Sequence, residues 1–391
     1  MNTDFSLEGV RRTVMGRGKA AQLAQEVELL GGGPVLAAVD PVVLEKEVAA
    51  PSLASLEAAG IQYQVYSDIT REPEASEADR AAQAARELGA RVVVGIGGGS
   101  ALDLAKAAAV LATNPGQAQD YVGLELVKEP GLPLICLPTT AGTGSEVTFT
   151  AVFTNRKEKK KGGINGRHLY PHTALLDPEL TLSCPPYVTA VVGMDALTHA
   201  MEAYTSRNAH PISDMNALAA IELIGRHLAP AVARGDDLEA REGMLLGSYL
   251  AGLALAQAGV GAVHAMAYPL GAMFDIPHGE ANAVLLPFVL GYNLMSCPQR
   301  FATMAMALGD CPPGLTTRRA AEYCLERVAL LSDDVGVPPD LGRLGVPQDQ
   351  IPAMAEMAMT VARPIANNPR RVEARDLEQI YERAFLGLQG G

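Results

Sequence analysis

The sequence predicts an α/β domain built on a parallel sheet, followed by a mostly helical domain. Between residues 30 and 180, short β-branched runs alternate with alanine-rich stretches of helical period, which is typical of a doubly wound sheet covered by helices. After Pro185 and Pro186, long stretches rich in alanine, leucine and methionine replace them. The chain of 391 residues is long enough for two domains. We therefore expect domains at residues 1–186 and 187–391.

Each expected strand is a short apolar run bounded by polar or turn-forming residues. The strands are Val35–Val39, Gln62–Tyr66, Arg91–Gly95, Leu132–Leu137 and Thr173–Asp177. Alanine and leucine at spacings of three and four predict the helices that connect and cover them. These helices include Ser76–Leu88 and Ala101–Ala112, and the same period predicts helices over Ala217–Ala233 and Leu238–Ala258 in the second domain.

Composition and charge narrow the classes of function. Apolar residues make up 48% and charged residues 19% of the chain, as in ordinary globular proteins. The formal net charge of −13 would repel phosphate backbones and anionic lipid headgroups, so neither nucleic acid nor a membrane is an expected partner. The five cysteines are scattered without a CxxC pair, and no signal peptide pattern opens the chain. A reducing, cytoplasmic location is therefore expected.

Two polar turns follow neighbouring expected strands. Residues 95–100 read Gly-Ile-Gly-Gly-Gly-Ser between a strand and a helix, where glycines and free helix amides favour a diphosphate. A tight turn without a ligand explains these glycines equally well, since Ser100 replaces the third glycine of GxGxxG. Residues 138–146 form a second turn after the next strand, and the carboxyl ends of parallel strands share one edge. Together the two turns predict a nucleotide site.

Asp40 is the acidic residue best placed to meet an adenosine ribose, because it ends the strand Val35–Val39. Its charge would repel a 2′-phosphate, which favours NAD over NADP. A helix cap or turn former is an equally good interpretation of Asp40, which Pro41 follows. The basic run 156–161 is usually a solvated loop, but in this acidic protein it could supply one lysine to the cofactor.

Three histidines, His199, His264 and His278, lie in otherwise apolar or glycine-rich segments. Asp195 and His199 share one helical face at a spacing that suits two ligands of one metal, although a surface pair or a hydrogen-bonded core histidine is the alternative. His264 lies on a helix that Pro269 is expected to end or kink, and His278 in a Pro-Gly turn. One carboxylate and three imidazoles suit Fe(II) or Zn(II), with an open position for catalysis. The remaining histidines are expected to be surface or structural: His168, His172, His210 and His227.

These motifs together resemble the iron-containing (group III) alcohol dehydrogenases. The resemblance covers nearly the whole chain in the same order and spacing. It rests on the glycine turn with Asp103 and Lys106, the turn 139–146, the segment Gly193–His199, and His264 through His278 and Gly279. It implies a dehydroquinate synthase-like fold, with an N-terminal NAD-binding α/β domain, a helical C-terminal metal-binding domain and an active site in the cleft between them. It also implies homodimers or larger homo-oligomers.

The resemblance further implies roles for particular residues. NAD(H) contacts are implied for Asp40, Gly97, Gly98, Ser100, Thr139, Thr140 and Lys161. Ligation of a divalent metal, usually Fe(II) and in some relatives Zn(II), is implied for Asp195, His199, His264 and His278. Tyr268 stands where many members have a histidine near the reacting centre, so Tyr268 and His278 are the candidate catalytic residues. Thr150 stands where several relatives have an asparagine, and no cofactor contact is assigned to it.

The expected activity is reversible hydride transfer between a primary alcohol or aldehyde and NAD(H), with the metal as Lewis acid on the substrate oxygen. One alternative is a related enzyme of the same fold, such as a glycerol dehydrogenase, a glycerol-1-phosphate dehydrogenase or a dehydroquinate synthase, in which the metal ligands are spaced differently. A second is a non-catalytic nucleotide-binding sensor that uses only the glycine turns. That alternative leaves Asp195 and the three histidines unexplained.

Overall fold

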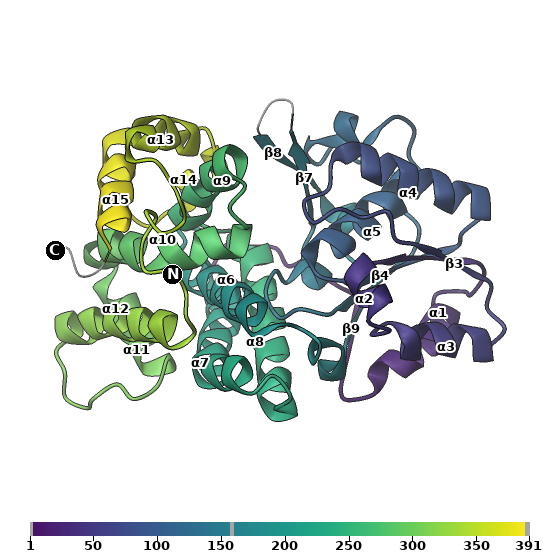
Figure 1. Ribbon diagram of the computed structural model, residues 1–391, viewed down its shortest axis with the longest axis horizontal. Coiled ribbons are helices and arrows are strands. Elements are labelled where there is room, and N and C mark those ends of the chain that lie inside the picture. The colour runs from purple at the N-terminus through teal and green to yellow at the C-terminus, as the bar shows by residue number, and fades with distance from the viewer. Residues whose placement is uncertain (1–2, 157–159, 388–391) are drawn as a thin grey trace. The chain divides into compact units, whose positions relative to one another are not determined.

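The computed structural model describes residues 3–156 and 160–387, and these divide into two compact units (Figure 1). Residues 8–184 form the α/β unit, whereas residues 3–7 and 185–387 form the helical unit. The boundary expected near residue 186 lies where α6 (Pro186–Thr205) begins. The described residues before Glu8 belong to the helical unit, which differs from the expected division.

A parallel sheet of six strands forms the centre of the α/β unit. In order across the sheet, the strands are β1 (Arg12–Met15), β9 (Thr173–Leu176), β6 (Leu134–Pro138), β4 (Val92–Gly97), β2 (Val35–Val39) and β3 (Tyr63–Tyr66). Every residue of β2, β4 and β6 is buried, as central strands covered on both faces require. All five expected strands are present, and β1 is an additional strand at one edge.

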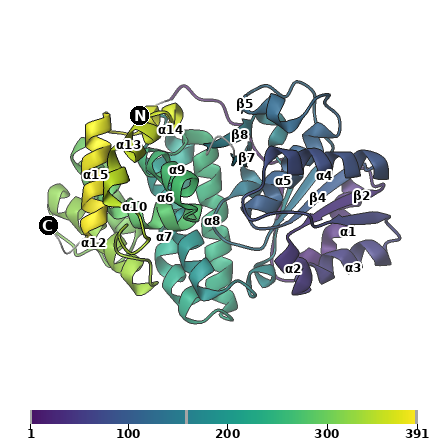
Figure 2. The same ribbon diagram turned by 45° about the horizontal axis from the view of Figure 1, so that its top comes forward.

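Helices cover both faces of this sheet (Figure 2). Alternate residues of β4 point to opposite faces, because side chains alternate along a strand. Val92 and Val94 belong to the apolar cluster shared with α1 (Leu23–Leu29) and α3 (Ala50–Ala58), while Val93 belongs to the cluster shared with α4 (Ala75–Leu88) and α5 (Gly99–Leu111). A short helix, α2 (Pro41–Glu45), follows β2.

A second, smaller sheet in this unit was not expected from the sequence. Its order is β5 (Gly123–Leu124), β8 (Lys160–Asn165) and β7 (Thr150–Asn155), with β7 antiparallel to β8. The basic run 156–161 therefore lies partly in a strand rather than in a solvated loop. Residues 157–159 of that run lie outside the described residues.

The helical unit contains helices and loops but no strand among residues 185–387. After α6 come α7 (Pro211–Ala233), α8 (Leu238–Ala258), α9 (Ala262–Phe274), α10 (His278–Asn293), α11 (Pro298–Ala307), α12 (Thr317–Asp334), α13 (Ile351–Met359), α14 (Ala362–Asn367) and α15 (Ala374–Leu386). The two helices predicted in this half lie within α7 and α8. Helix α6 is largely buried and packs against α7, α8 and α10, so polar side chains on it lie inside the unit.

Within the described ranges, no single helix has the length and apolarity needed to cross a membrane. Helices α8 and α9 meet that requirement only when they are taken together across a bend of 103°.

Gly95 on β4 lets α5 lie close to the sheet. A Cβ atom at this position would lie 2.8 Å from Ala105 Cβ and 3.2 Å from Leu102 Cδ2. We expect Gly95→Ala to lower the free energy of unfolding by about 1–3 kcal/mol, because overpacking forces the helix or the strand to shift. Denaturant-induced unfolding measures this change.

The matched control is Gly291→Ala in α10, where an added Cβ meets no atom within 4 Å. This change is expected to be neutral or to stabilise by up to about 1 kcal/mol, since alanine favours a helix over glycine. Equal stability of Gly95→Ala and the wild type would contradict the close packing of α5 on β4.

Candidate functional site

The carboxyl ends of β2, β4 and β6 lie next to one another, and a polar turn follows each of them. The backbone amide of Asp40 donates to the carbonyl of Ile96 at 2.9 Å, and the amide of Thr139 donates to the carbonyl of Gly97 at 3.0 Å. Because β3 and β4 pair with opposite sides of β2, the order of the strands reverses here. Such a reversal is the place where ligands bind in open α/β sheets.

The glycine turn is in close contact with both neighbouring turns. A Cβ atom at Gly97 would lie 2.8 Å from Asp40 Cβ, so no larger residue fits without a shift. Gly98 precedes the first turn of α5 without a side-chain cap, and a Cβ there would lie 3.4 Å from Thr140 Oγ1. The first amides of α5 are thus presented at the edge where the turns meet, which is an arrangement that favours a bound anion.

Two of the predicted cofactor residues also have local partners. Asp40 caps α2, because its Oδ1 accepts hydrogen bonds from the amides of Val42 at 2.8 Å and Val43 at 3.2 Å. The helix-cap interpretation of Asp40 is therefore correct. The hydroxyl of Ser100 donates to the carbonyl of Arg71.

Lys161 lies on β8, and its side chain is nearly buried. Its Nζ donates to Glu72 Oε1 at 2.8 Å. Glu72 follows Arg71, the residue that Ser100 contacts, so Lys161 lies close to the loop against which the glycine turn rests.

Lys106 of α5, which is buried, and Asp103, which is mostly buried, form an ion pair. Lys106 Nζ donates to the carbonyl of Thr150 at 2.8 Å and lies 3.6 Å from Asp103 Oδ1. Asp103 accepts from Ser145 Oγ at 2.5 Å and from the amide of Val152 at 2.9 Å. Burial lowers the pKa of Lys106 and raises the pKa of Asp103, and each charge opposes the shift of the other. The pair ties the second polar turn and β7 to the helix that begins at the glycine turn.

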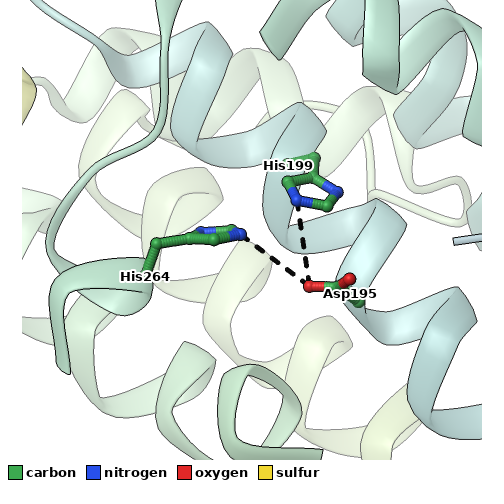
Figure 3. A group of neighbouring side chains, drawn as sticks. All are labelled: Asp195, His199 and His264. Carbon is green, nitrogen blue, oxygen red and sulfur yellow. Dashed lines mark ion pairs between the residues drawn. The ribbon is translucent and has the colours of Figure 1, made fainter. Parts of the chain in front are cut away.

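A second group of functional side chains lies in the helical unit. Asp195 and His199 from α6 converge with His264 from α9, and their ligand atoms lie within 4.8 Å of one another (Figure 3). His199 Nε2 lies 3.9 Å and His264 Nε2 lies 3.8 Å from Asp195 Oδ1, and all three residues are buried. Tetrahedral ligands about 2.1 Å from an ion lie about 3.4 Å apart, so a small closure of this group fits one divalent cation.

His278 lies beside this group, with its ring centroid 5.3 Å from that of His264. It is only half-buried, unlike the other three residues. Helix α9 continues past Pro269 to Phe274, so Pro269 does not end the helix. Helix α9 ends instead at its C-cap Asp275, which has a left-handed φ of +55°. The expectation that His278 lies in a turn was wrong, because His278 is the first residue of α10.

Asn282, one turn after His278, was not predicted as a site residue. Its Nδ2 lies 2.7 Å from Asp195 Oδ1, 3.2 Å from His264 Nε2 and 3.1 Å from His278 Nε2. Side-chain atoms of three candidate ligands therefore converge on one amide nitrogen, as they would on a cation. Its Oδ1 is buried and accepts no hydrogen bond from any residue in the described ranges. The signal in the sequence that points to Asn282 is its position four residues after His278, which places both on one face of a helix.

Glu202 was also missed, although it lies on the same face of α6 as Asp195 and His199. Its side chain is buried. Glu202 Oε2 lies 2.6 Å from His264 Nδ1, and Oε1 accepts from the amide of Val263 at 2.7 Å. The spacing of three from His199 was the signal in the sequence.

The charge state of Asp195 suits a metal ligand. Burial alone would raise the pKa of this carboxyl, but the neighbouring histidines and the Asn282 amide hold it below its ordinary value. An ionised carboxylate is the form that binds a cation.

Tyr268 lies on α9, one turn after His264. Its ring centroid is 5.9 Å from that of His278. The structure therefore brings the candidate proton relay next to the most exposed of the four candidate ligands.

Comparison with known proteins identifies the family. Residues 11–178 match the model of the iron-containing alcohol dehydrogenases, and residues 189–385 match that of the C-terminal part of the Fe-containing alcohol dehydrogenase family. The chain is 44% identical to long-chain-alcohol dehydrogenase 1 of Geobacillus thermodenitrificans, over 95% of each chain. The chain belongs to the iron-containing alcohol dehydrogenase family.

Solved structures agree with this assignment. The crystal structure of a 1,3-propanediol oxidoreductase matches with a TM-score of 0.95 and 38% identity, over 98% of this chain and 100% of that one. The sulfoacetaldehyde reductase of Bifidobacterium kashiwanohense, solved in complex with NAD⁺, matches with a TM-score of 0.88 and 30% identity, over 97% and 98%. The protein is an NAD-dependent alcohol oxidoreductase, and the expected fold class and enzyme class are confirmed.

Glu146, in the second polar turn, is expected to make the stability of the protein depend on pH. It is buried, its Oε1 accepts no hydrogen bond from a described residue, and burial raises its pKa to about 7. Between about pH 4.5 and 7 the folded protein keeps a proton that the unfolded chain releases, so stability falls as the pH rises through this range. Glu146→Gln should remove this loss and gain about 3 kcal/mol over the wild type on going from about pH 4 to 8.

Denaturant-induced unfolding at several pH values measures the effect. The matched control is Glu77→Gln, another buried glutamate, whose carboxylate accepts hydrogen bonds from Thr70 and from the amide of Glu74. This control removes an acceptor that Thr70 and Glu74 use, so it should lower the free energy of unfolding by about 1–3 kcal/mol. A Glu146→Gln variant with the pH dependence of the wild type would disprove the prediction.

Proposed function

We propose that the protein transfers a hydride reversibly between a primary alcohol, or its aldehyde, and NAD(H) at a divalent metal, with Fe(II) as the native ion and Zn(II) as the alternative. The observation that carries this proposal is the convergence of Asp195, His199 and His264, with His278 beside them, in the helical unit. A donor set of one carboxylate and three imidazoles, without thiolate, suits both ions.

The residues proposed for NAD(H) lie in the α/β unit. The amides of Gly97 and Gly98 and the start of α5 would take the diphosphate, where Ser100, Thr139 and Thr140 add polar groups. Asp40 would meet the adenosine ribose, and Lys161 is proposed as a further contact. The meeting of Asp40, Gly97 and Thr139 at one sheet edge supports this assignment.

A divalent metal at the four ligands would supply a Lewis acid for the substrate oxygen. The chain itself holds the four candidate ligands in position. Asp195 and the histidines are held on α6, α9 and α10, and the burial of three of them keeps water away from their donor atoms. When an alcohol is oxidised, the hydride goes to the nicotinamide and the hydroxyl proton must leave. Tyr268 Oη is proposed to receive that proton while passing its own towards solvent.

The relatives support a substrate class rather than one substrate. Their names refer to long-chain alcohols, to 1,3-propanediol and to sulfoacetaldehyde. A terminal alcohol or aldehyde carbon is the group that these compounds share. We also propose a homodimer or larger homo-oligomer in a reducing compartment such as the cytoplasm, and the five free cysteines support the reducing compartment.

The first test is oxidation of NADH by chelator-stripped protein, measured anaerobically against short aldehydes with Fe(II), Zn(II) or no metal. Activity is expected only with a metal. Asp195→Ala and His278→Ala should each lower activity by more than about 100-fold, because losing a ligand costs more than losing an outer partner. NADH binding should remain nearly intact. Full activity in a variant shown to be free of metal would refute the proposal.

A second test concerns Tyr268. Tyr268→Phe keeps the ring and removes the hydroxyl, so kcat should fall by about 100-fold or more while metal content stays unchanged. Tyr268→His is the matched variant, because an imidazole also relays protons, and it should recover much of the loss. A phenylalanine variant with the kcat of the wild type would exclude the relay.

A further inference from the structure

Glu202 satisfies two hydrogen-bond donors at the point where α9 begins. The first amides of a helix have no partner within the helix, and Gly261, which precedes α9, offers no side-chain cap. Glu202 Oε1 accepts from the amide of Val263 at 2.7 Å. Glu202 Oε2 lies 2.6 Å from Nδ1 of His264, the next residue. One carboxylate from α6 thus fixes both the start of α9 and the candidate ligand on it.

Gly261 makes this approach possible. A Cβ atom at Gly261 would lie 3.0 Å from Glu202 Oε1 and 3.3 Å from Asn368 Oδ1. Asn368 Oδ1 in turn accepts from the amide of Ala262 at 3.4 Å. Glycine therefore leaves room for two side chains to reach the buried amides of Ala262 and Val263, which have no partner within the helix.

The contacts on the two nitrogens of His264 agree on one tautomer. A carboxylate offers acceptors and no donor, so His264 Nδ1 must carry the hydrogen that points at Glu202. Nε2 then holds a lone pair, and this nitrogen faces Asn282 Nδ2 at 3.2 Å, an amide donor. Asn282 Nδ2 is oriented as a donor by a separate contact with Asp195 Oδ1 at 2.7 Å. The Nε2 lone pair therefore lies on the side of Asp195, where the candidate ligands meet.

We propose that Glu202 is the residue that positions His264 for metal binding, by holding its ring in the tautomer whose Nε2 lone pair faces Asp195. The inference rests on the proposed metal site. Glu202 itself touches neither substrate nor metal in this role. Outer partners of this kind fix the ring orientation of a ligating histidine and make it a better donor.

The sharpest test is Glu202→Gln, which has nearly the same shape but only one acceptor oxygen for two donors. If that oxygen keeps the amide of Val263, the side-chain NH₂ faces His264 Nδ1 and moves the imidazole hydrogen to Nε2. If the side chain turns over, its NH₂ opposes the amide of Val263. In either case the affinity for the metal should fall by about 10- to 100-fold.

The readout is the binding of Zn²⁺ to chelator-stripped, full-length protein, measured by competition with a chromophoric chelator. NMR of isotope-labelled histidine in the metal-free protein reports the tautomer of His264 independently of any activity. The matched control is Glu77→Gln, a buried glutamate of the α/β unit that also loses an acceptor. It should bind Zn²⁺ like the wild type.

Gly261→Ala tests the same inference with Glu202 intact, should the glutamine variant fail to fold. The new Cβ would press on Glu202 Oε1, so Zn²⁺ affinity should fall, by a smaller factor than in Glu202→Gln. Gly291→Ala, with open space around the added atom, is its control.

The outcomes separate the two proposals. A wild-type protein that binds no Zn²⁺ overturns the proposed metal site, and this inference with it. Strong binding by the wild type together with unchanged binding in folded Glu202→Gln and Gly261→Ala variants overturns the role of Glu202 alone. An equal loss in Glu77→Gln would show a general effect of stability and also overturn it.

Discussion

The candidate metal site in the helical unit depends on hydrogen bonds to buried acceptor atoms that face one another. Asp195 and His264 direct an oxygen and a nitrogen lone pair into the buried interior, where such groups are costly unless they are paired. Asn282 provides the donor that meets both of them. These contacts tie α6, α9 and α10 together, because each helix contributes one member of the group.

In the α/β unit, the groups presented at the edge of the sheet are mainly backbone atoms of the turns. Its parallel strands bring three turns to one edge, and the glycine at position 97 lets them approach without a side chain between them. The ion pair of Asp103 and Lys106 then ties α5 to the segment that enters the small sheet. A shift of α5 would therefore disturb both polar turns at once.

Local sequence pattern predicted the parts of this structure that depend on local burial. The central strands appear as continuous apolar runs because both of their faces are covered, and Val35–Val39 was located to the residue. The edge strand β1 and strand β5 of the small sheet are short and partly exposed, so their composition does not distinguish them from loops. Asp195 and His199 were detectable because they lie one turn apart on one helix. Glu202 and Asn282 lie about one turn from His199 and His278, but that spacing alone does not assign them a role, because their partners lie 62 and 87 residues away in the chain.

The division of the chain has a consequence for biosynthesis. The described residues before Glu8 belong to the helical unit, where the ring of Phe5 stacks on that of His210 at 4.0 Å. The α/β unit is therefore inserted between two parts of the helical unit. Because domains generally fold as units during synthesis, the strands and helices of the α/β unit can complete their fold while the segment around Phe5 still lacks its partner. That first segment must wait for roughly 200 further residues to leave the ribosome before α7 can receive it.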